Sequence, residues 1–378
     1  MSRAALAVAA LLAVAAVPAS AQSALTLPPS GDNQRSVVTQ YMGLVSASID
    51  YSSPDVTSPT GEDRRGKIWG QLVPYGMTDL GFNGGKPSPW RAGANENTVF
   101  TVSHDVQVEG QPLPAGRYGL HMIPGPEEWT VVFSKNSSTW GSYWYEPSED
   151  ALRVTVKPVK NEYRHWLTYE FEDRQQDSSV ASLQWEELKV PFKISVPNGN
   201  ELYFEKLSDE LRGAPGFDFQ AYENAAQFAL QRDIHLDQAL VWAEKASGPP
   251  LGRETISTLT TKAQVLDKLG RGEEALQAVK KALDLPSASA TDIHMLGRQL
   301  QAQGKTKEAV EVFKHNAKRY PGVWPTEVGL ARAHSALGEY ATALEHAKTA
   351  LAQAPDPQNK QTLERAVKML TEGKDFNN

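Results

Sequence analysis

The residues best suited to chemistry in this sequence lie in one short stretch, Trp90-Arg91-Ala92-Gly93-Ala94-Asn95-Glu96. Arg91 offers a planar fork that matches a carboxylate, and Asn95 offers both donors and an acceptor. Glu96 can serve as an acid, a base or an acceptor for a sugar hydroxyl. The glycine and a strand predicted at residues 98–102 indicate a loop, where binding groups usually sit on a rigid β scaffold.

Tryptophans accompany this stretch, and two interpretations of them are open. In the first, Trp69, Trp140 and Trp144 form an apolar platform for a sugar ring or another flat ligand. In the second, Arg91 pairs with Glu96 to close the loop, and the tryptophans fill the core. The first interpretation gives a candidate ligand site but no assigned catalytic residue: Trp69, Trp90, Arg91, Asn95, Glu96 and Trp140.

The sequence gives no pattern for a metal or a cofactor. There is no cysteine, and His104, His121 and His165 each stand alone, without the short spacing of a zinc site. We expect His121, in an apolar strand, to be a packed imidazole. The string Gly270-x-Gly272-x-x-Ala275 imitates a dinucleotide fingerprint, but it does not follow a strand in a βαβ unit. We therefore expect no metal and no bound cofactor.

Acidic pairs do not make a hydrolase site here either. Neighbours such as Glu127-Glu128, Glu149-Asp150 and Glu186-Glu187 occur near predicted turns. Adjacent residues of a strand point to opposite faces, so such a pair does not form a catalytic dyad. No G-x-S-x-G string of a serine hydrolase is present either.

The first residues predict export. Arg3 precedes an apolar stretch over residues 4–17, and Pro18-Ala19-Ser20-Ala21 supplies small residues at a cleavage site. This is typical of a secretory signal peptide over residues 1–21, cleaved after Ala21. We expect a periplasmic or secreted protein with no membrane span, in which residues 22–35 form a flexible segment.

Residues 36–197 have the pattern of a β domain. Short runs with a period of two, such as residues 98–102, 129–133 and 152–157, alternate with turns that contain Gly and Pro. Many short strands with frequent turns indicate an antiparallel β-sandwich or barrel. A further strand is predicted at residues 188–194, where Pro191 indicates an edge or a bulge.

The second half contains a repeat. Buried-type alanines recur at Ala239, Ala275, Ala309 and Ala343, and each of the last three follows a glycine by five residues: Gly270, Gly304 and Gly338. Prolines close each unit at positions 286, 321 and 355. A period near 34 residues of paired helices is typical of tetratricopeptide repeats. Residues 217–355 resemble that family, and Leu296-Gly297 matches its Leu-Gly pair.

The repeats therefore predict an α-helical solenoid of about four units over residues 217–373, closed by a capping helix. Residues 198–216 are predicted to form a linker with a short helix. In the first unit Ile234 stands where the turn glycine is expected. The fold class is thus multidomain, a β domain followed by a solenoid.

The β half resembles a family of bacterial domains of unknown function, family 2911. The motifs that carry the resemblance occur in order over residues 36–196: RGKIWGQLVPYG (65–76), WRAGANENT (90–98), LPAGRYGLHMIPG (113–125), WTVVFSK (129–135) and WGSYWY (140–145). The resemblance implies an exported protein with a β-rich fold. Residues 77–89 depart from it, because many members run directly from PYG to the Trp-Arg motif.

Two functions follow from these patterns. The first is an exported binding or scaffold protein, whose repeats hold a protein or peptide on their concave face while the β domain binds a glycan or small molecule. The second is a hydrolase or lyase that acts on envelope carbohydrate or a small molecule at the Trp90–Glu96 loop. The formal net charge of −7 is modest, and without clustered positive charge we expect no nucleic-acid partner.

Overall fold

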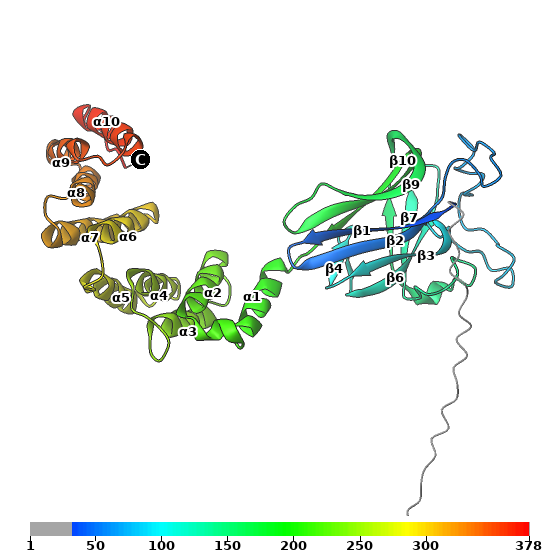
Figure 1. The fold of residues 1–378 in the computed structure, drawn as a ribbon, viewed down its shortest axis with the longest axis horizontal. Helices are drawn as coiled ribbons and strands as arrows, with labels where there is room; N and C mark the ends of the chain where they lie inside the picture. The colour runs from blue at the N-terminus through cyan, green and yellow to red at the C-terminus, as the bar shows by residue number, and fades with distance from the viewer. Residues whose placement is uncertain (1–31, 378) are drawn as a thin grey trace, which may run out of the picture. The chain divides into compact units, whose positions relative to one another are not determined.

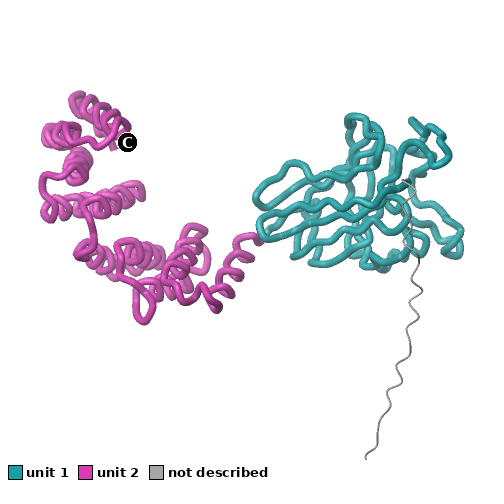
Figure 2. The backbone as a smooth tube through the Cα atoms, in the orientation of Figure 1, with its two compact units in different colours: residues 1–197 teal, residues 198–378 magenta. Residues whose placement is uncertain are grey.

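The structure is a computed structural model that describes residues 32–377. It divides into two compact units, with the division between Pro197 and Asn198 (Figure 2). The predicted signal peptide and most of the predicted flexible segment lie outside the described residues. No helix among the described residues is long and apolar enough to cross a bilayer.

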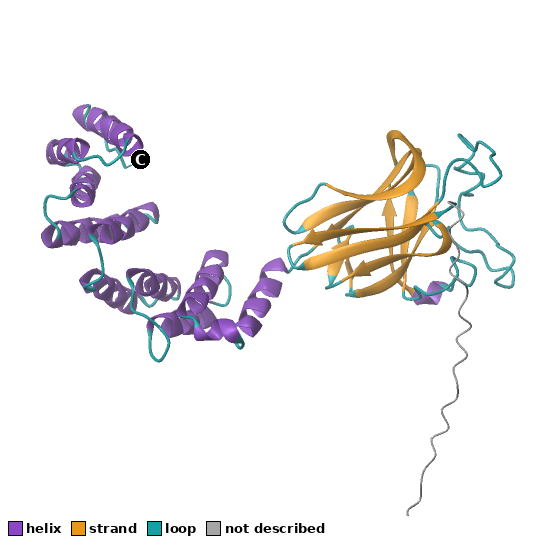
Figure 3. Cartoon of the chain, viewed as in Figure 1, coloured by secondary structure: helices purple, strands orange, loops and turns teal. Residues whose placement is uncertain are grey.

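The first unit consists of two antiparallel sheets (Figures 1 and 3). The larger sheet has six strands, in the order β1 (Gln34–Met42), β2 (Val45–Ser53), β3 (Ala94–Val102), β6 (Gly116–Ile123), β7 (Trp129–Ser134) and β8 (Asp150–Val156). The smaller sheet has four, in the order β5 (Gln111–Leu113), β4 (Val106–Val108), β10 (Ser178–Ser195) and β9 (Val159–Glu172). This confirms an antiparallel β domain.

The core of this unit lies between the two sheets. Along β2, residues 45–50 alternate between buried and half-buried, as expected of a strand with one face on a core. Phe100 and Phe133 of the larger sheet meet Phe192 of the smaller sheet, with ring centroids 6.5 and 5.9 Å apart. Such packing of two sheets favours the sandwich over the barrel.

Two details differ from the sequence-based expectations. β1 begins at Gln34, two residues before the predicted start of the domain, and pairs with β2 from its first residue. Pro191 lies in β10, an inner strand rather than an edge. Its missing N–H is tolerated because β10 pairs with β9 only as far as Lys189 and with β4 only from Ile194.

The second unit is entirely helical and begins with α1 (Gly199–Glu210), where the short linker helix was predicted. Four helical hairpins follow: α2 (Phe219–Arg232) with α3 (Leu236–Ser247), α4 (Ile256–Lys268) with α5 (Gly272–Asp284), α6 (Ala290–Ala302) with α7 (Thr306–Arg319), and α8 (Trp324–Ala336) with α9 (Tyr340–Ala352). α10 (Pro357–Thr371) comes last. The order and pairing of these helices confirm the predicted solenoid (Figure 1).

The repeat residues have the predicted physical roles. The alanines Ala239, Ala275, Ala309 and Ala343 are all buried where the helices of a hairpin approach. Each turn glycine of the last three hairpins has a φ of 76°, which glycine adopts without cost. In the first hairpin Asp233 takes this left-handed conformation instead, with a φ of 57°, so the chain turns one residue before Ile234.

Candidate functional site

The structure divides four of the six residues of the predicted ligand site between two hollows of the β unit, and Trp69 and Asn95 line neither of them. Trp90 and Arg91 line a hollow of about 400 Å³, together with Trp185 and Ser142. Glu96 and Trp140 line another of about 310 Å³. The two sets do not converge on one cavity, because the loop before β3 faces one hollow and Glu96, inside β3, faces the other.

Arg91 holds its own loop closed. Its Nη1 donates a hydrogen bond of 2.5 Å to the backbone carbonyl of Asn95, and its guanidinium lies 4.6 Å from the ring centroid of Tyr143. The side-chain Oδ1 of Asn95 accepts a hydrogen bond from Asn33. No ion pair joins Arg91 to Glu96 among the described residues, so the pair that the second interpretation contained is wrong. The backbone carbonyl closes the loop instead.

The tryptophans also separate into two groups. Trp69 packs edge-on against Trp90, Trp129 and Trp185, with ring centroids 5.8, 5.2 and 5.7 Å apart. The buried indole N–H of Trp69 has no partner among the described residues. Trp140, by contrast, is 51% exposed. Trp69 therefore contributes to a packed aromatic cluster. Trp144 is as exposed as Trp140, at 52%, but of the two only Trp140 lines a hollow of the β unit.

The hollow beside Trp140 contains two carboxylates with different surroundings. Glu96 is exposed and accepts a hydrogen bond of 3.3 Å from Ser52. Asp50 accepts two bonds from Arg35, at 2.8 and 2.5 Å, and these bonds lower the pKa of Asp50 below its ordinary value. Arg117 also lines the hollow. Because Asp50 stays ionised, it is unsuited to donate the proton that glycoside cleavage needs.

His121 is a packed imidazole, as predicted. It is buried, its Nδ1 lies 3.1 Å from Ser142 Oγ, and its ring meets Tyr145 edge-on. Burial, with a smaller contribution from Arg91, lowers the pKa of His121 to about 4. A base of such low pKa activates a serine poorly near neutral pH. Within residues 32–377 no three His, Asp or Glu side chains are placed to hold a metal ion.

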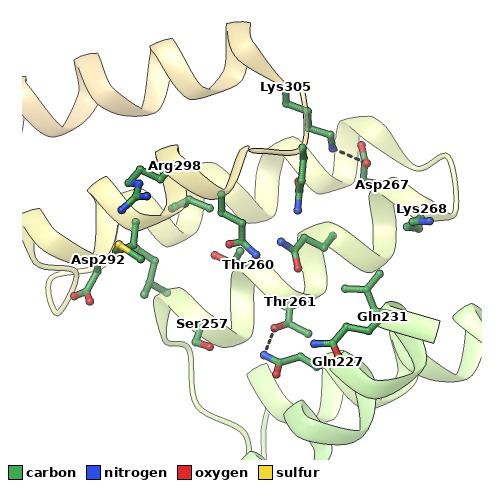
Figure 4. A pocket seen from close by; sticks show the side chains of 17 residues that line it. Gln227, Gln231, Ser257, Thr260, Thr261, Asp267, Lys268, Asp292, Arg298 and Lys305 are labelled. Carbon is green, nitrogen blue, oxygen red and sulfur yellow. Dashed lines mark hydrogen bonds and ion pairs between the residues drawn. The ribbon is translucent and has the colours of Figure 1, made fainter. Parts of the chain in front are cut away.

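A hollow larger than the two of the β unit lies in the helical unit, on the face formed by the first helices of the hairpins. We call this the inner face. It contains a groove of about 980 Å³ lined by residues of α2, α4 and α6 and of the turn after α6 (Figure 4). The sequence predicted a partner on this face but identified no residues. The repeat itself could have identified them, because Gln264, Arg298 and Arg332 recur at intervals of 34 residues and so occupy equivalent positions of successive units.

Some polar side chains of the groove already have partners. Lys305 pairs with Asp267 at 2.5 Å, and Gln227 donates a 3.1 Å bond to Thr261 (Figure 4). Lys268 pairs with Asp233. These contacts join neighbouring hairpins, so they position the walls of the groove.

Other polar groups in the groove are open to a ligand. Arg298 has no carboxylate partner among the described residues, and in the same part of the chain four glutamine side chains make no hydrogen bond: Gln231, Gln264, Gln299 and Gln303. Met295 adds an apolar contact and is 53% exposed. Each amide can both donate and accept, so the groove offers amide pairing, one positive charge and an adaptable apolar spot.

A second hollow, of about 750 Å³, lies where α5 and α7 flank the same junction of hairpins. Leu276, Val279 and Val312 give it an apolar floor. Its rim is rich in lysines, which are Lys280, Lys305, Lys307, Lys314 and Lys318.

Comparison with known proteins gives the class of each unit. Residues 328–361 match a tetratricopeptide repeat model, so the helical unit is a tetratricopeptide array. Residues 33–194 match the model of the family described as "Protein of unknown function (DUF2911)". The match covers the β unit, the part of the chain in which the five motifs occur. No curated protein matches the chain.

Several solved structures are similar to part of the chain. YrrB, described as a TPR protein with an unusual peptide-binding site, is 20% identical with a TM-score of 0.29, covering 44% of this chain and 84% of its own. MamA is 15% identical with a TM-score of 0.28, covering 42% and 84%. A tetratricopeptide repeat protein from Parabacteroides merdae is 15% identical with a TM-score of 0.31, covering 46% and 70%.

Proposed function

We propose that this protein is a binding or scaffold protein whose helical unit holds an extended segment of a partner protein along α2, α4 and α6. The observation that carries the proposal is the inner-face groove with its unpartnered glutamines. A repeat array presents such a surface for partners. An extended segment carries unpaired backbone donors and acceptors, and amide side chains satisfy both kinds.

The charges of the groove define the partner further. Lys305 and Lys268 are already neutralised by ion pairs, and the carboxylate of Asp292 is hydrogen-bonded in the capping box of α6. Arg298 is therefore the positive charge of the groove that remains to be matched. A carboxylate on the partner would meet it in a two-bond geometry that lysine does not offer. A flexible apolar side chain or aromatic ring on the same segment would pack on Met295.

A displayed peptide library tests this proposal. Selection on the purified protein is expected to enrich acidic, extended peptides, and calorimetry then gives the affinity of a selected peptide. Combined Gln264→Ala, Arg298→Ala and Gln299→Ala changes should weaken binding about 100-fold or more, since lost hydrogen bonds and a lost charge pair add up.

The control is Gln277→Ala, which removes an exposed glutamine of α5 that lines neither hollow of this unit. It should leave the affinity unchanged. Equal binding by the triple variant and the parent, or no enrichment at all, contradicts the proposal.

We also propose that the β unit binds a polar ligand, such as a glycan or small molecule, beside Trp140 and Glu96. An exposed indole next to a carboxylate and Arg117 supports this. On a glycan and small-molecule panel, Trp140→Ala should lose a ligand that Trp144→Ala keeps, because Trp144 is equally exposed but lies outside the hollow.

Export is part of the same proposal. The arginine, the apolar stretch and the small residues before Gln22 support a periplasmic or secreted location. Cell fractionation with mass spectrometry of the mature chain should find an N-terminus at Gln22. Recovery of the intact chain in the cytosol would argue against export.

A further inference from the structure

A short segment of the chain itself covers part of the inner face. After α10 the chain turns at Gly373, with a φ of 70°, and residues 375–377 return to α8. Asp375 accepts a 2.5 Å hydrogen bond from Ser335, and the backbone N–H of Phe376 donates to the same hydroxyl at 3.2 Å. With this cover Ser335 is only 1% exposed.

Arg332 is the second anchor of this segment. Its guanidinium lies 5.3 Å from the ring centroid of Phe376, and its Nη1 donates a 3.2 Å bond to Oδ1 of Asn377. The side-chain amide of Asn377 donates in turn to the backbone carbonyl of Arg332 at 3.0 Å. Three successive residues of the segment therefore contact two residues one turn apart on α8. Asn377 also bonds to Asp375, and Phe376 packs against the core cluster of Ala331, Ala343 and Leu370.

The segment satisfies Arg332 incompletely. The buried Nε of Arg332 has no partner in the described part of the chain, and a weak contact with Gln301 at 3.5 Å is its other side-chain bond. Burial, with a smaller contribution from Arg298, lowers the pKa of Arg332 to about 10, and Asp375 acts in the opposite direction. Arg332 makes no ion pair within the described residues and bonds instead to the neutral amide of Asn377, so an occupant with a carboxylate at that place would fit it better.

We propose that the inner face of α8, at Arg332 and Ser335, is a binding site for a short partner segment in which an acidic residue precedes an aromatic one, and that residues 375–377 occupy this site in cis. The partner segment displaces them. This site lies on the hairpin beyond the groove of α2, α4 and α6, so it extends the proposed function without depending on it.

The cis segment itself supplies the probe. A fluorescent peptide of residues 372–378 is titrated against the chain ended after Glu372, which keeps all of α10, and against the full chain, with binding followed by anisotropy. The shortened chain should bind at least about tenfold more tightly, because in the full chain the same residues compete at a high effective concentration. Equal binding, or none to a folded shortened chain, overturns the proposal.

Changes in the probe keep the test independent of protein folding. A peptide with Phe376→Ala should lose binding, since the ring supplies the contact with the guanidinium. A peptide with Asn377→Asp should bind about five- to tenfold more tightly, because a carboxylate meets Arg332 in a charge-assisted bond. Unchanged affinity for either peptide contradicts the assignment of these contacts.

Two protein variants complete the design. Arg332→Gln in the shortened chain should abolish the gain from Asn377→Asp, whereas Lys348→Gln, at an exposed lysine of α9 without an ion pair in the described residues, should keep it. If the shortened chain does not fold, the full chain with Asp375, Phe376 and Asn377 all changed to Ala takes its place. The library-selected peptides bind elsewhere on the inner face, so failure of one proposal leaves the other measurable.

Discussion

At the scale of single residues, the contact between Gly141 and Arg91 determines the shape of the loop before β3. A Cβ at position 141 would lie 2.4 Å from Cζ of Arg91, and the φ of Gly141 is 59°. We predict that Gly141→Ala displaces the guanidinium and destabilises the β unit by about 2–4 kcal/mol in urea unfolding, through the clash and the backbone strain together.

Gly61→Ala is the matched control for this prediction. Gly61 also has a positive φ, 87°, but nothing lies within 4 Å of its added Cβ. It should cost only the backbone term, about 1 kcal/mol. If the two variants lose equal stability, the contact of Gly141 with Arg91 has no energetic role.

His121 gives the β unit a defined pH dependence. Its pKa is about 4 in the folded state and about 6.5 when unfolded, so between these values the unfolded chain binds the extra proton. Stability is therefore complete above pH 6.5 and falls as the pH decreases, by about 2 kcal/mol at pH 5 from this group. Unfolding curves at pH 7.5 and 5 measure it.

A difference between variants isolates the contribution of His121 from that of the carboxylates. His121→Gln should remove this part of the pH dependence, whereas His104→Gln, at a half-buried position, should retain it. An unchanged slope in His121→Gln contradicts the prediction.

The candidate site was predictable from the sequence in residue type but not in arrangement. Trp90 and Arg91 do lie just before a strand, as their neighbours indicated, whereas Asn95 is already the second residue of β3. The Arg91–Asn95 bond depends on left-handed backbone at Ala92 and Asn95, with φ of 53° and 56°, which non-glycine residues seldom adopt. A residue pattern does not encode such a conformation, so the sequence left both interpretations open and did not indicate the backbone carbonyl of Asn95 as the partner of Arg91.

At the scale of elements, Phe313 of α7 determines how closely the third and fourth hairpins pack. A Cβ on Gly297 of α6 would lie 2.4 Å from the ring of Phe313, and one on Gly329 of α8 would lie 2.8 Å from it. We predict that Gly297→Ala destabilises the helical unit by about 1–3 kcal/mol, since overpacking moves the ring. Thermal unfolding followed by helix content measures the loss.

Gly272→Ala provides the comparison. Gly272 is the first residue of α5, and nothing lies within 4 Å of its added Cβ. Alanine there should leave stability unchanged or raise it by up to about 1 kcal/mol, through its better helix propensity. A loss as large as that of Gly297→Ala would refute the packing explanation.

Element order was predictable for the helices and not for the sheets. Helical hairpins pair neighbours in sequence, so the 34-residue frame of Ala275, Ala309 and Ala343 was sufficient to place them. Sheet order depends on contacts between distant residues: β3 pairs with β6, and β10 pairs with β4. The alternation of residues along a strand shows which face of the strand is buried, but it does not show which other strand pairs with it.

At the scale of the whole molecule, the two units have separate cores and should fold separately. The helical cores contain residues of that unit alone. We predict that residues 32–197 give the circular dichroism of sheet and residues 198–378 that of helix, each with its own cooperative unfolding transition. Helix in the first piece, or an unfolded second piece, would contradict this division.

The indole cluster of Trp69, Trp90, Trp129 and Trp185 gives the protein a natural optical label. All four rings lie in the β unit with centroids 5.2 to 6.5 Å apart, close enough for their transition dipoles to couple. Near-ultraviolet ellipticity should therefore report the tertiary order of this unit, while the array contributes only Trp242 and Trp324. A circular dichroism spectrometer can thus follow the β unit by its near-ultraviolet signal and the helical unit by its helix signal, in the intact chain and without an attached dye.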